Sequence, residues 1–137
     1  MPLVFRVMKK SEDGLPTVEQ SANGLGVRPG NDVDVDSQGN VVVNGKGMSV
    51  SPSLRDIASW RIPKRLRDKI PDARGSNNRF CFRTGTGPFQ AGEFAPGLDL
   101  VPDKATHGCI APAQYVSLGQ YESDLAATRP DWQLDEN

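Results

Sequence analysis

Glycine and proline interrupt this chain so often that they exclude long helices along most of it. Its 137 residues include 14 glycines and 11 prolines, and the apolar runs between them are short. Short apolar runs bounded by turn residues are typical of strands. This length also suits one hydrophobic core rather than two. We therefore expect a single domain over residues 1–137 that is rich in strands and turns, with a C-terminal tail at 129–137.

Charge and hydropathy argue against several classes of partner. The formal net charge of −1 gives no global attraction to nucleic acids or anionic membranes. The chain has no run of about 18 apolar residues that would span a bilayer, and its first residues lack the basic-then-apolar order of a signal peptide. We expect a cytoplasmic protein with neither a membrane nor a nucleic acid as its partner.

The apolar periodicity and the turn residues predict the order of elements. Strands are expected at residues 3–8, 48–51 and 79–83, and hairpins at 33–43 and 98–111. A short helix is expected at 53–58, and residues 13–31 and 89–96 are expected to be irregular. Ser117 and Gln120 form a capping-box pattern, which predicts a helix over residues 118–127. Trp132 and Leu134 are expected to pack back on the core.

Two of the predicted strands carry polar residues that are candidates for a binding site. Arg6 interrupts the first apolar run and lies on the face opposite Phe5 and Val7. Its guanidinium suits a phosphate or a carboxylate at the edge of a cleft, although a solvated arginine on a half-buried strand is an alternative. Ser49 lies in a strand of period two that follows Gly47, where small side chains let a ligand approach closely.

The segment from Leu98 to Leu125 holds the only histidine, His107, and one of the two cysteines, Cys109. Residues two apart share a face of a strand, so the imidazole and the thiol are expected to point the same way. One histidine and two cysteines are too few for a closed zinc site, and we predict no metal site.

A basic tract follows the short helix predicted at 53–58. It contains Arg61, Lys64, Arg65, Arg67 and Lys69, diluted by one aspartate. Such a tract is either a solvated basic face or a surface for an anionic partner, and the sequence leaves both alternatives open.

Motifs spread over the whole chain resemble bacterial type VI secretion effector toxins with an ADP-ribosyltransferase-like fold. The similarity is strongest from Pro96 to Leu125, where a strand, a turn, a strand with histidine and a helix follow one another. The motifs that carry it are Phe5-Arg6, Gly47-Met48-Ser49, Trp60-Arg61-Ile62-Pro63, Pro96-Gly97-Leu98, and Asp103 followed by His107-Gly108-Cys109-Ile110-Ala111-Pro112.

The resemblance implies a compact single α+β domain with short helices and a split, twisted antiparallel β-sheet core around a cleft for NAD. It also implies a toxin or effector that acts in the cytoplasm of a target cell, with a cognate immunity protein as partner. Arg6, Ser49 and His107 match positions of that pattern. The resemblance assigns the pyrophosphate to Arg6 and the nicotinamide pocket to Ser49. His107 would orient the ribose or transfer a proton. Ser49 and His107 are thus the expected catalytic residues, and all three are expected to bind the cofactor.

The chain departs from the family pattern at one position. ADP-ribosyltransferases use a late-strand glutamate for the ribose hydroxyl, and no glutamate adjoins His107. Glu93 and Glu122 are the candidates to replace it.

Two other functions remain open. The Thr106-His107-Gly108-Cys109 segment also resembles L,D-transpeptidases, whose cysteine thiolate attacks peptidoglycan peptides. Those enzymes use another histidine upstream, which this chain lacks. A non-enzymatic binding domain is the third hypothesis.

Overall fold

Two antiparallel sheets and one α-helix form the framework of the computed structural model, which describes residues 1–136. One sheet has the order β1-β3-β7 and the other the order β2-β6-β5-β4. The strands are β1 (Val4–Met8), β2 (Met48–Val50), β3 (Phe80–Thr84), β4 (Gly92–Ala95), β5 (Leu98–Lys104), β6 (His107–Pro112) and β7 (Gln133–Leu134). The prediction of an α+β fold with antiparallel sheets is confirmed.

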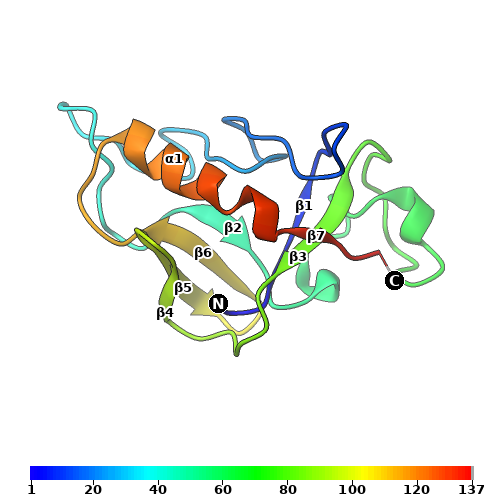
Figure 1. The fold of residues 1–137 in the computed structure, drawn as a ribbon. Coiled ribbons are helices and arrows are strands. Elements are labelled where there is room, and N and C mark those ends of the chain that lie inside the picture. Colours follow the sequence, from blue (N-terminus) through cyan, green and yellow to red (C-terminus); the bar gives the residue numbers. More distant parts are fainter. Residues whose placement is uncertain (137) are drawn as a thin grey trace.

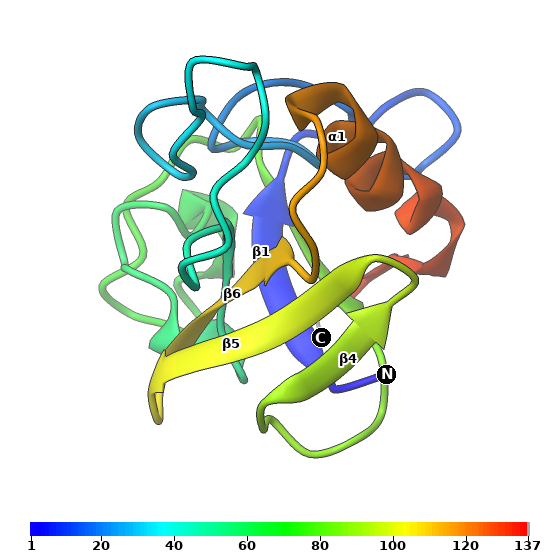
Figure 2. The same cartoon turned by 90° about the vertical axis from the view of Figure 1, so that its left-hand side faces the viewer.

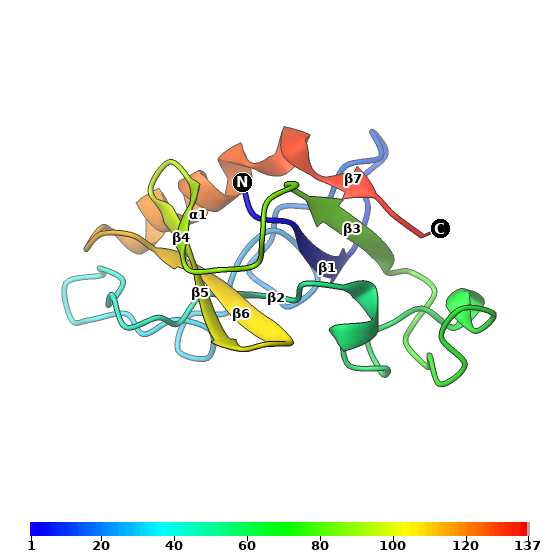
Figure 3. The same cartoon turned by 90° about the horizontal axis from the view of Figure 1, so that it is seen from below.

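The two sheets meet where β1 passes the end of β2. Phe5 N donates to Ser51 O over 2.7 Å, and Ser51 N donates to Phe5 O over 3.0 Å. This single bridge joins the sheets edge to edge. Figure 3 shows β4, β5 and β6 on one side and β1, β3 and β7 on the other, with β2 between them. The bridge therefore fixes β1 relative to β2, the strands that carry Arg6 and Ser49.

The helix α1 (Leu118–Ala127) lies along one side of both sheets (Figure 1). Ser117 Oγ accepts a hydrogen bond from Gln120 N, as the capping pattern predicts. Tyr121 and Leu125, one helical turn apart, are fully buried in the core between α1 and the sheets. Figure 2 shows β4, β5 and β6 side by side beneath the helix. The local sequence thus specifies both the start of α1 and the face that it buries.

The opposite face of β1 and β3 is covered by an irregular segment. This segment contains the one-turn 3₁₀ helices η1 (Leu54–Asp56) and η2 (Lys64–Leu66). A third 3₁₀ helix, η3 (Arg129–Asp131), lies elsewhere, directly after α1. Val7 and Cys81 pack there with Ile62, Leu66, Ile70 and Ala73. The helix expected at 53–58 is therefore a single turn. Within residues 1–136, no helix combines the length and the apolarity needed to cross a membrane.

Cations of the basic tract bind the protein's own carbonyl groups. Arg65 donates to the carbonyls of Asn77 and Arg79, and its guanidinium pairs with Glu136. Arg67 Nε donates to Ala73 O over 2.7 Å. Irregular backbone leaves carbonyls without strand or helix partners, so buried ones need side-chain donors. Arg65 and Arg67 therefore stabilise the loop, which weakens the alternative of a surface for an anionic partner.

The structure differs from several other local predictions, all of which concern short elements with few strand or helix hydrogen bonds. Residues 33–43 form the expected turn, closed by an antiparallel bridge between Val35 and Val41 and by hydrogen bonds from Asp36 N to Asn40 O and from Val42 N to Asp34 O, but its arms are not full strands. Residues 89–96 include the edge strand β4. Trp132 is buried as expected, but Leu134 on the edge strand β7 is exposed. The tail predicted at 129–137 contains η3 and β7, and its last residue lies outside the described residues.

Candidate functional site

A cleft of about 450 Å³ opens where the two sheets meet. Its walls are β1, β2, the tip of the β5–β6 hairpin, and two irregular segments. One segment contributes Ala22, Arg28 and Asp32, and the other contributes Asp56, Ile57, Ala58, Trp60 and Arg61. Ligand sites in proteins commonly have volumes of roughly 300 to 1,000 Å³. The cleft is thus large enough for a small-molecule ligand.

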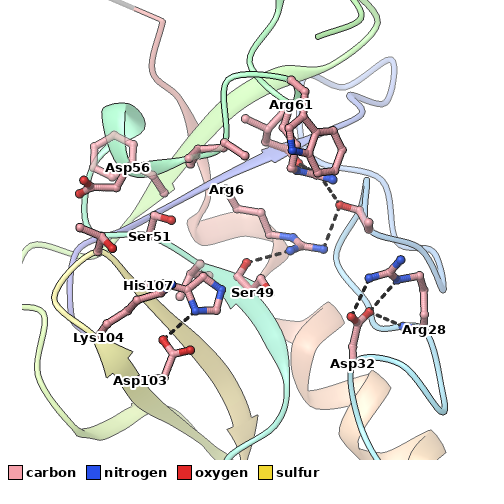
Figure 4. Close-up of a pocket in the computed structure, with 18 residues that line it drawn as sticks. Arg6, Arg28, Asp32, Ser49, Ser51, Asp56, Arg61, Asp103, Lys104 and His107 are labelled. Atoms are coloured by element: carbon pink, nitrogen blue, oxygen red, sulfur yellow. Dashed lines mark hydrogen bonds and ion pairs between the residues drawn. The ribbon is translucent and has the colours of Figure 1, made fainter. Parts of the chain in front are cut away.

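The three residues predicted as site residues all line this cleft. Arg6 comes from the middle of β1, Ser49 from β2 and His107 from the start of β6 (Figure 4). β2 pairs with β6 so that Ser49 lies opposite Cys109, two residues along from His107. Strand pairing and the bridge between the sheets thus bring together Arg6 and His107, which are 101 positions apart in the sequence.

Arg6 is buried, with 7% of its surface exposed, so the alternative of a solvated arginine is wrong. Its guanidinium donates four hydrogen bonds to three carbonyls. Nε and Nη2 donate to Gly24 O over 3.1 and 3.0 Å, Nη2 also to Ala22 O over 3.3 Å, and Nη1 to Ser49 O over 2.8 Å. A guanidinium has five N–H groups, so one on Nη1 remains for a ligand. Most of the donor capacity of Arg6 stabilises the cleft itself.

A second guanidinium, that of Arg61, lies beside the first. Its Nη2 donates to Ala22 O over 2.6 Å, the carbonyl that Arg6 also contacts, and to Val7 O over 3.3 Å. The preceding residue, Trp60, is 53% exposed, and its ring lies 5.5 Å from the Arg61 guanidinium. In the sequence, Arg61 belongs only to the basic tract and to a motif of the resemblance, because its long-range contact with Ala22 leaves no local pattern.

Neither guanidinium has a carboxylate partner among residues 1–136. Burial, and then the nearby Arg61, lower the pKa of Arg6 to about 10. Burial likewise lowers the pKa of Arg61. Asp32 also lines the cleft, but it accepts hydrogen bonds from the backbone and side chain of Arg28. Because buried charges are normally paired, the two arginines make this wall favourable for an anion.

His107 forms a hydrogen bond with Asp103. Its Nδ1 lies 2.7 Å from Asp103 Oδ1, across the tip of the β5–β6 hairpin. The hydrogen bond from His107 lowers the pKa of the Asp103 carboxyl. Figure 4 shows the imidazole between Asp103 on one side and Ser49 on the other. Asp103 also lines the cleft, and the sequence motif that contains it predicted no role for it.

Neither glutamate that was considered as a replacement for the family's glutamate lies in the cleft. Glu93 is on β4 and lines a separate cavity beside α1, and Glu122 on α1 accepts a hydrogen bond from Gln20 Nε2 over 2.6 Å. The carboxylates of the described cleft are Asp32, Asp56 and Asp103.

Cys109 lacks the environment of an activated nucleophile. It is half-buried and is not among the described residues that line the cleft. Burial raises the pKa of the Cys109 thiol, whereas a nucleophilic cysteine needs a lowered one. The one histidine of the chain directs its Nδ1 to Asp103. The described site thus supplies no thiol–imidazole pair of the transpeptidase kind.

We predict slow reaction of both cysteines with a thiol reagent in the native protein at pH 7. Burial raises the pKa of Cys81 to about 12 and that of Cys109 also above its usual range, so both are protonated at neutral pH. The label count should reach two only when urea unfolds the chain, and Cys109→Ala should leave one labelled site. Fast labelling of Cys109 at pH 7 would contradict this prediction.

Comparisons with models of known families, with curated proteins and with solved structures give no match.

Proposed function

We propose that this chain is a bacterial effector toxin with an ADP-ribosyltransferase-like fold that binds NAD in the cleft between its sheets and acts in the cytoplasm of a target cell. The observation that carries the proposal is the convergence of Arg6, Ser49 and His107 on one cleft, beside two guanidinium groups without carboxylate partners. A dinucleotide offers the complementary chemistry, namely a doubly charged pyrophosphate between two ribosides.

The residues suggest a division of roles along such a ligand. Arg61 and the remaining N–H of Arg6 would bind the pyrophosphate, because guanidinium groups form short charge-assisted hydrogen bonds with phosphate oxygens. The exposed ring of Trp60 offers a stacking surface for a planar heterocycle. Ser49 would support the nicotinamide, and His107 would contact the ribose. The described residues that line the cleft include no glutamate, so its aspartates would have to stabilise the cationic transition state.

The proposed activity implies a neutralising partner in the producing cell. A toxin that consumes NAD or modifies cytoplasmic targets harms any bacterium that makes it. We therefore also propose a cognate immunity protein, with neither a membrane nor a nucleic acid as the primary partner.

Expression in the bacterial cytoplasm tests the proposed function. Wild-type protein should arrest growth, and His107→Ala and Ser49→Ala should relieve the arrest. His107 is half-buried and Ser49 exposed on the cleft, so both substitutions should leave the fold intact. Arg6→Ala is unsuitable here, because it would also remove contacts that stabilise the fold. Asp68→Asn, at an exposed position outside the cleft, is the matched control.

Thermal unfolding of the purified protein provides the second readout. A ligand at a hundredfold excess over its Kd stabilises the native state by about 2.7 kcal/mol, so NAD should raise the melting temperature clearly. Harmless cytoplasmic expression together with an unchanged melting temperature would refute the proposal. Harm only after export to the periplasm, abolished by Cys109→Ala, would instead support a transpeptidase. NAD binding without turnover would indicate a binding domain.

A further inference from the structure

Asp103 and His107 contact each other because the β5–β6 hairpin is irregular at its end. The two residues are four apart, and the pairing of β5 with β6 shifts register between Pro102 and Lys104, so that Lys104 lies opposite His107. Asp103 lies at this shift, and its Oδ1 reaches His107 Nδ1 over 2.7 Å. The side chain of Asp103 is 57% exposed and that of His107 32% exposed. A contact between side chains as exposed as these contributes little to the stability of the fold.

The contact determines which ring nitrogen of the neutral imidazole carries the proton. An ionised carboxylate only accepts hydrogen bonds, so Nδ1 must be the donor. The lowered pKa of Asp103 keeps its carboxylate ionised at neutral pH. In a neutral imidazole the other nitrogen, Nε2, is then unprotonated and accepts hydrogen bonds. Figure 4 shows this second ring nitrogen on the side of Ser49 and Arg6.

We propose that Asp103 is a positioning residue that holds His107 with an unprotonated Nε2 facing the cleft, where it accepts the proton of an attacking hydroxyl group or water. This inference rests on the proposed function. The bond between nicotinamide N1 and ribose C1′ breaks, and the nicotinamide leaves with the electron pair. An oxygen of the acceptor forms a new bond to C1′, and its proton passes to Nε2. The resulting imidazolium is stabilised by the Asp103 carboxylate.

Other charged groups also face the cleft, and their charges also affect which ring nitrogen of His107 carries the proton. They are Lys104 on the hairpin, Arg6 on β1, Asp56 and Arg61 from the irregular segment, and the Arg28–Asp32 ion pair. Among the described residues, only Asp103 forms a hydrogen bond or ion pair with the imidazole. A substitution at Asp103 therefore changes the tautomer directly, whereas changes at the other groups act only through the electrostatic potential.

Nitrogen-15 NMR tests the tautomer without any knowledge of the acceptor, because the chain contains one histidine. The native protein should show a protonated Nδ1 and an unprotonated Nε2 in the neutral ring. Asp103→Ala should abolish this preference, Asp103→Glu should restore it in part, and Asp68→Asn should leave it unchanged. A native ring with its proton on Nε2 would overturn the inference, whether or not the protein binds NAD.

Turnover of NAD provides the kinetic test in the same variants. Asp103→Ala should lower kcat about 10- to 100-fold with little change in KM, since general-base catalysis contributes roughly 10² to 10⁴-fold. The pH at which kcat rises should shift in Asp103→Ala but not in Asp68→Asn. Unchanged kcat and pH profile in Asp103→Ala would overturn the inference. A native Nδ1–H tautomer with no NAD binding or turnover would refute the proposed function, and with it the proton transfer.

Discussion

Replacement of Arg6 by alanine is expected to destabilise the protein by about 4 kcal/mol or more. The substitution removes four hydrogen bonds from a buried guanidinium and leaves the carbonyls of Gly24 and Ser49 without their side-chain donor, whereas Ala22 O keeps the hydrogen bond from Arg61. Each buried acceptor without a partner costs about 1 to 3 kcal/mol. Typical domains are stable by only about 5 to 15 kcal/mol. Urea unfolding at pH 7 measures the loss.

One further variant separates the geometry of Arg6 from its charge, and another serves as a control. Arg6→Lys keeps the charge, but a single ammonium group cannot reproduce the planar fork that reaches three carbonyls, so a loss of about 2 kcal/mol or more is expected. Arg74→Ala is the control, because Arg74 is exposed and its side chain has no hydrogen bond or ion pair within residues 1–136. Its effect should stay within about 0.5 kcal/mol. Equal stability of Arg6→Ala and Arg74→Ala would show that the four hydrogen bonds contribute little.

This role of Arg6 changes how loss of toxicity should be interpreted. An inactive Arg6→Ala variant is expected from unfolding alone, so it says nothing about the pyrophosphate. His107 and Ser49, whose side chains support less of the fold, are the informative positions. Arg6 thus links fold and site, because the same side chain connects β1, β2 and the segment around Gly24.

The elements that could be predicted from the sequence are those specified by local interactions. The helix Leu118–Ala127 has a capping residue, a stripe that includes Tyr121 and Leu125, and a proline shortly after its end. The hairpin of β5 and β6 is likewise specified by two apolar runs around a turn. β4 was not predicted, because its Gly92 and Glu93 are exposed and it exists only through its pairing with β5.

The hairpin expected at 33–43 forms only one antiparallel bridge, for a related reason. Its valines do alternate with polar residues, but Val33 and Val41 insert into the core beneath an irregular segment instead of extending a sheet. Period-two alternation reports which side chains are buried, and in a loop-rich chain burial does not require a ladder of strand hydrogen bonds.

The candidate site was predictable in part. Arg6, Ser49 and His107 came from strands and from a family resemblance, and the structure brings them to one cleft. The two irregular walls, which contribute Ala22, Arg28 and Asp32 on one side and residues from Asp56 to Arg61 on the other, were not predicted as parts of the site. These walls are held by bonds from arginine side chains to distant carbonyls, such as Arg61 to Ala22. Such bonds have no periodicity and no fixed spacing, so a single sequence gives no pattern for them.

Replacement of Gly47 by alanine is expected to cost about 3 kcal/mol or more. Gly47 immediately precedes β2, and a Cβ at this position would lie 2.2 Å from Ile110 O and 2.8 Å from the Cα of Ala111. These atoms belong to the backbone of β6, so no side-chain rotation relieves the clash. β2 and β6 must separate, which also moves Ser49 relative to His107.

Gly119→Ala is the matched control for the same chemical change. Gly119 lies in the first turn of α1, and the nearest atom to an added Cβ is Ser117 Oγ at 4.0 Å. Alanine is the better helix former, so this variant should be more stable by about 0.5 to 1 kcal/mol. Neither glycine has a positive φ, so the difference in stability between the two variants reports the steric clash at Gly47 rather than backbone strain. If Gly47→Ala unfolded at the same urea concentration as wild type, the close approach of β2 and β6 would not be required.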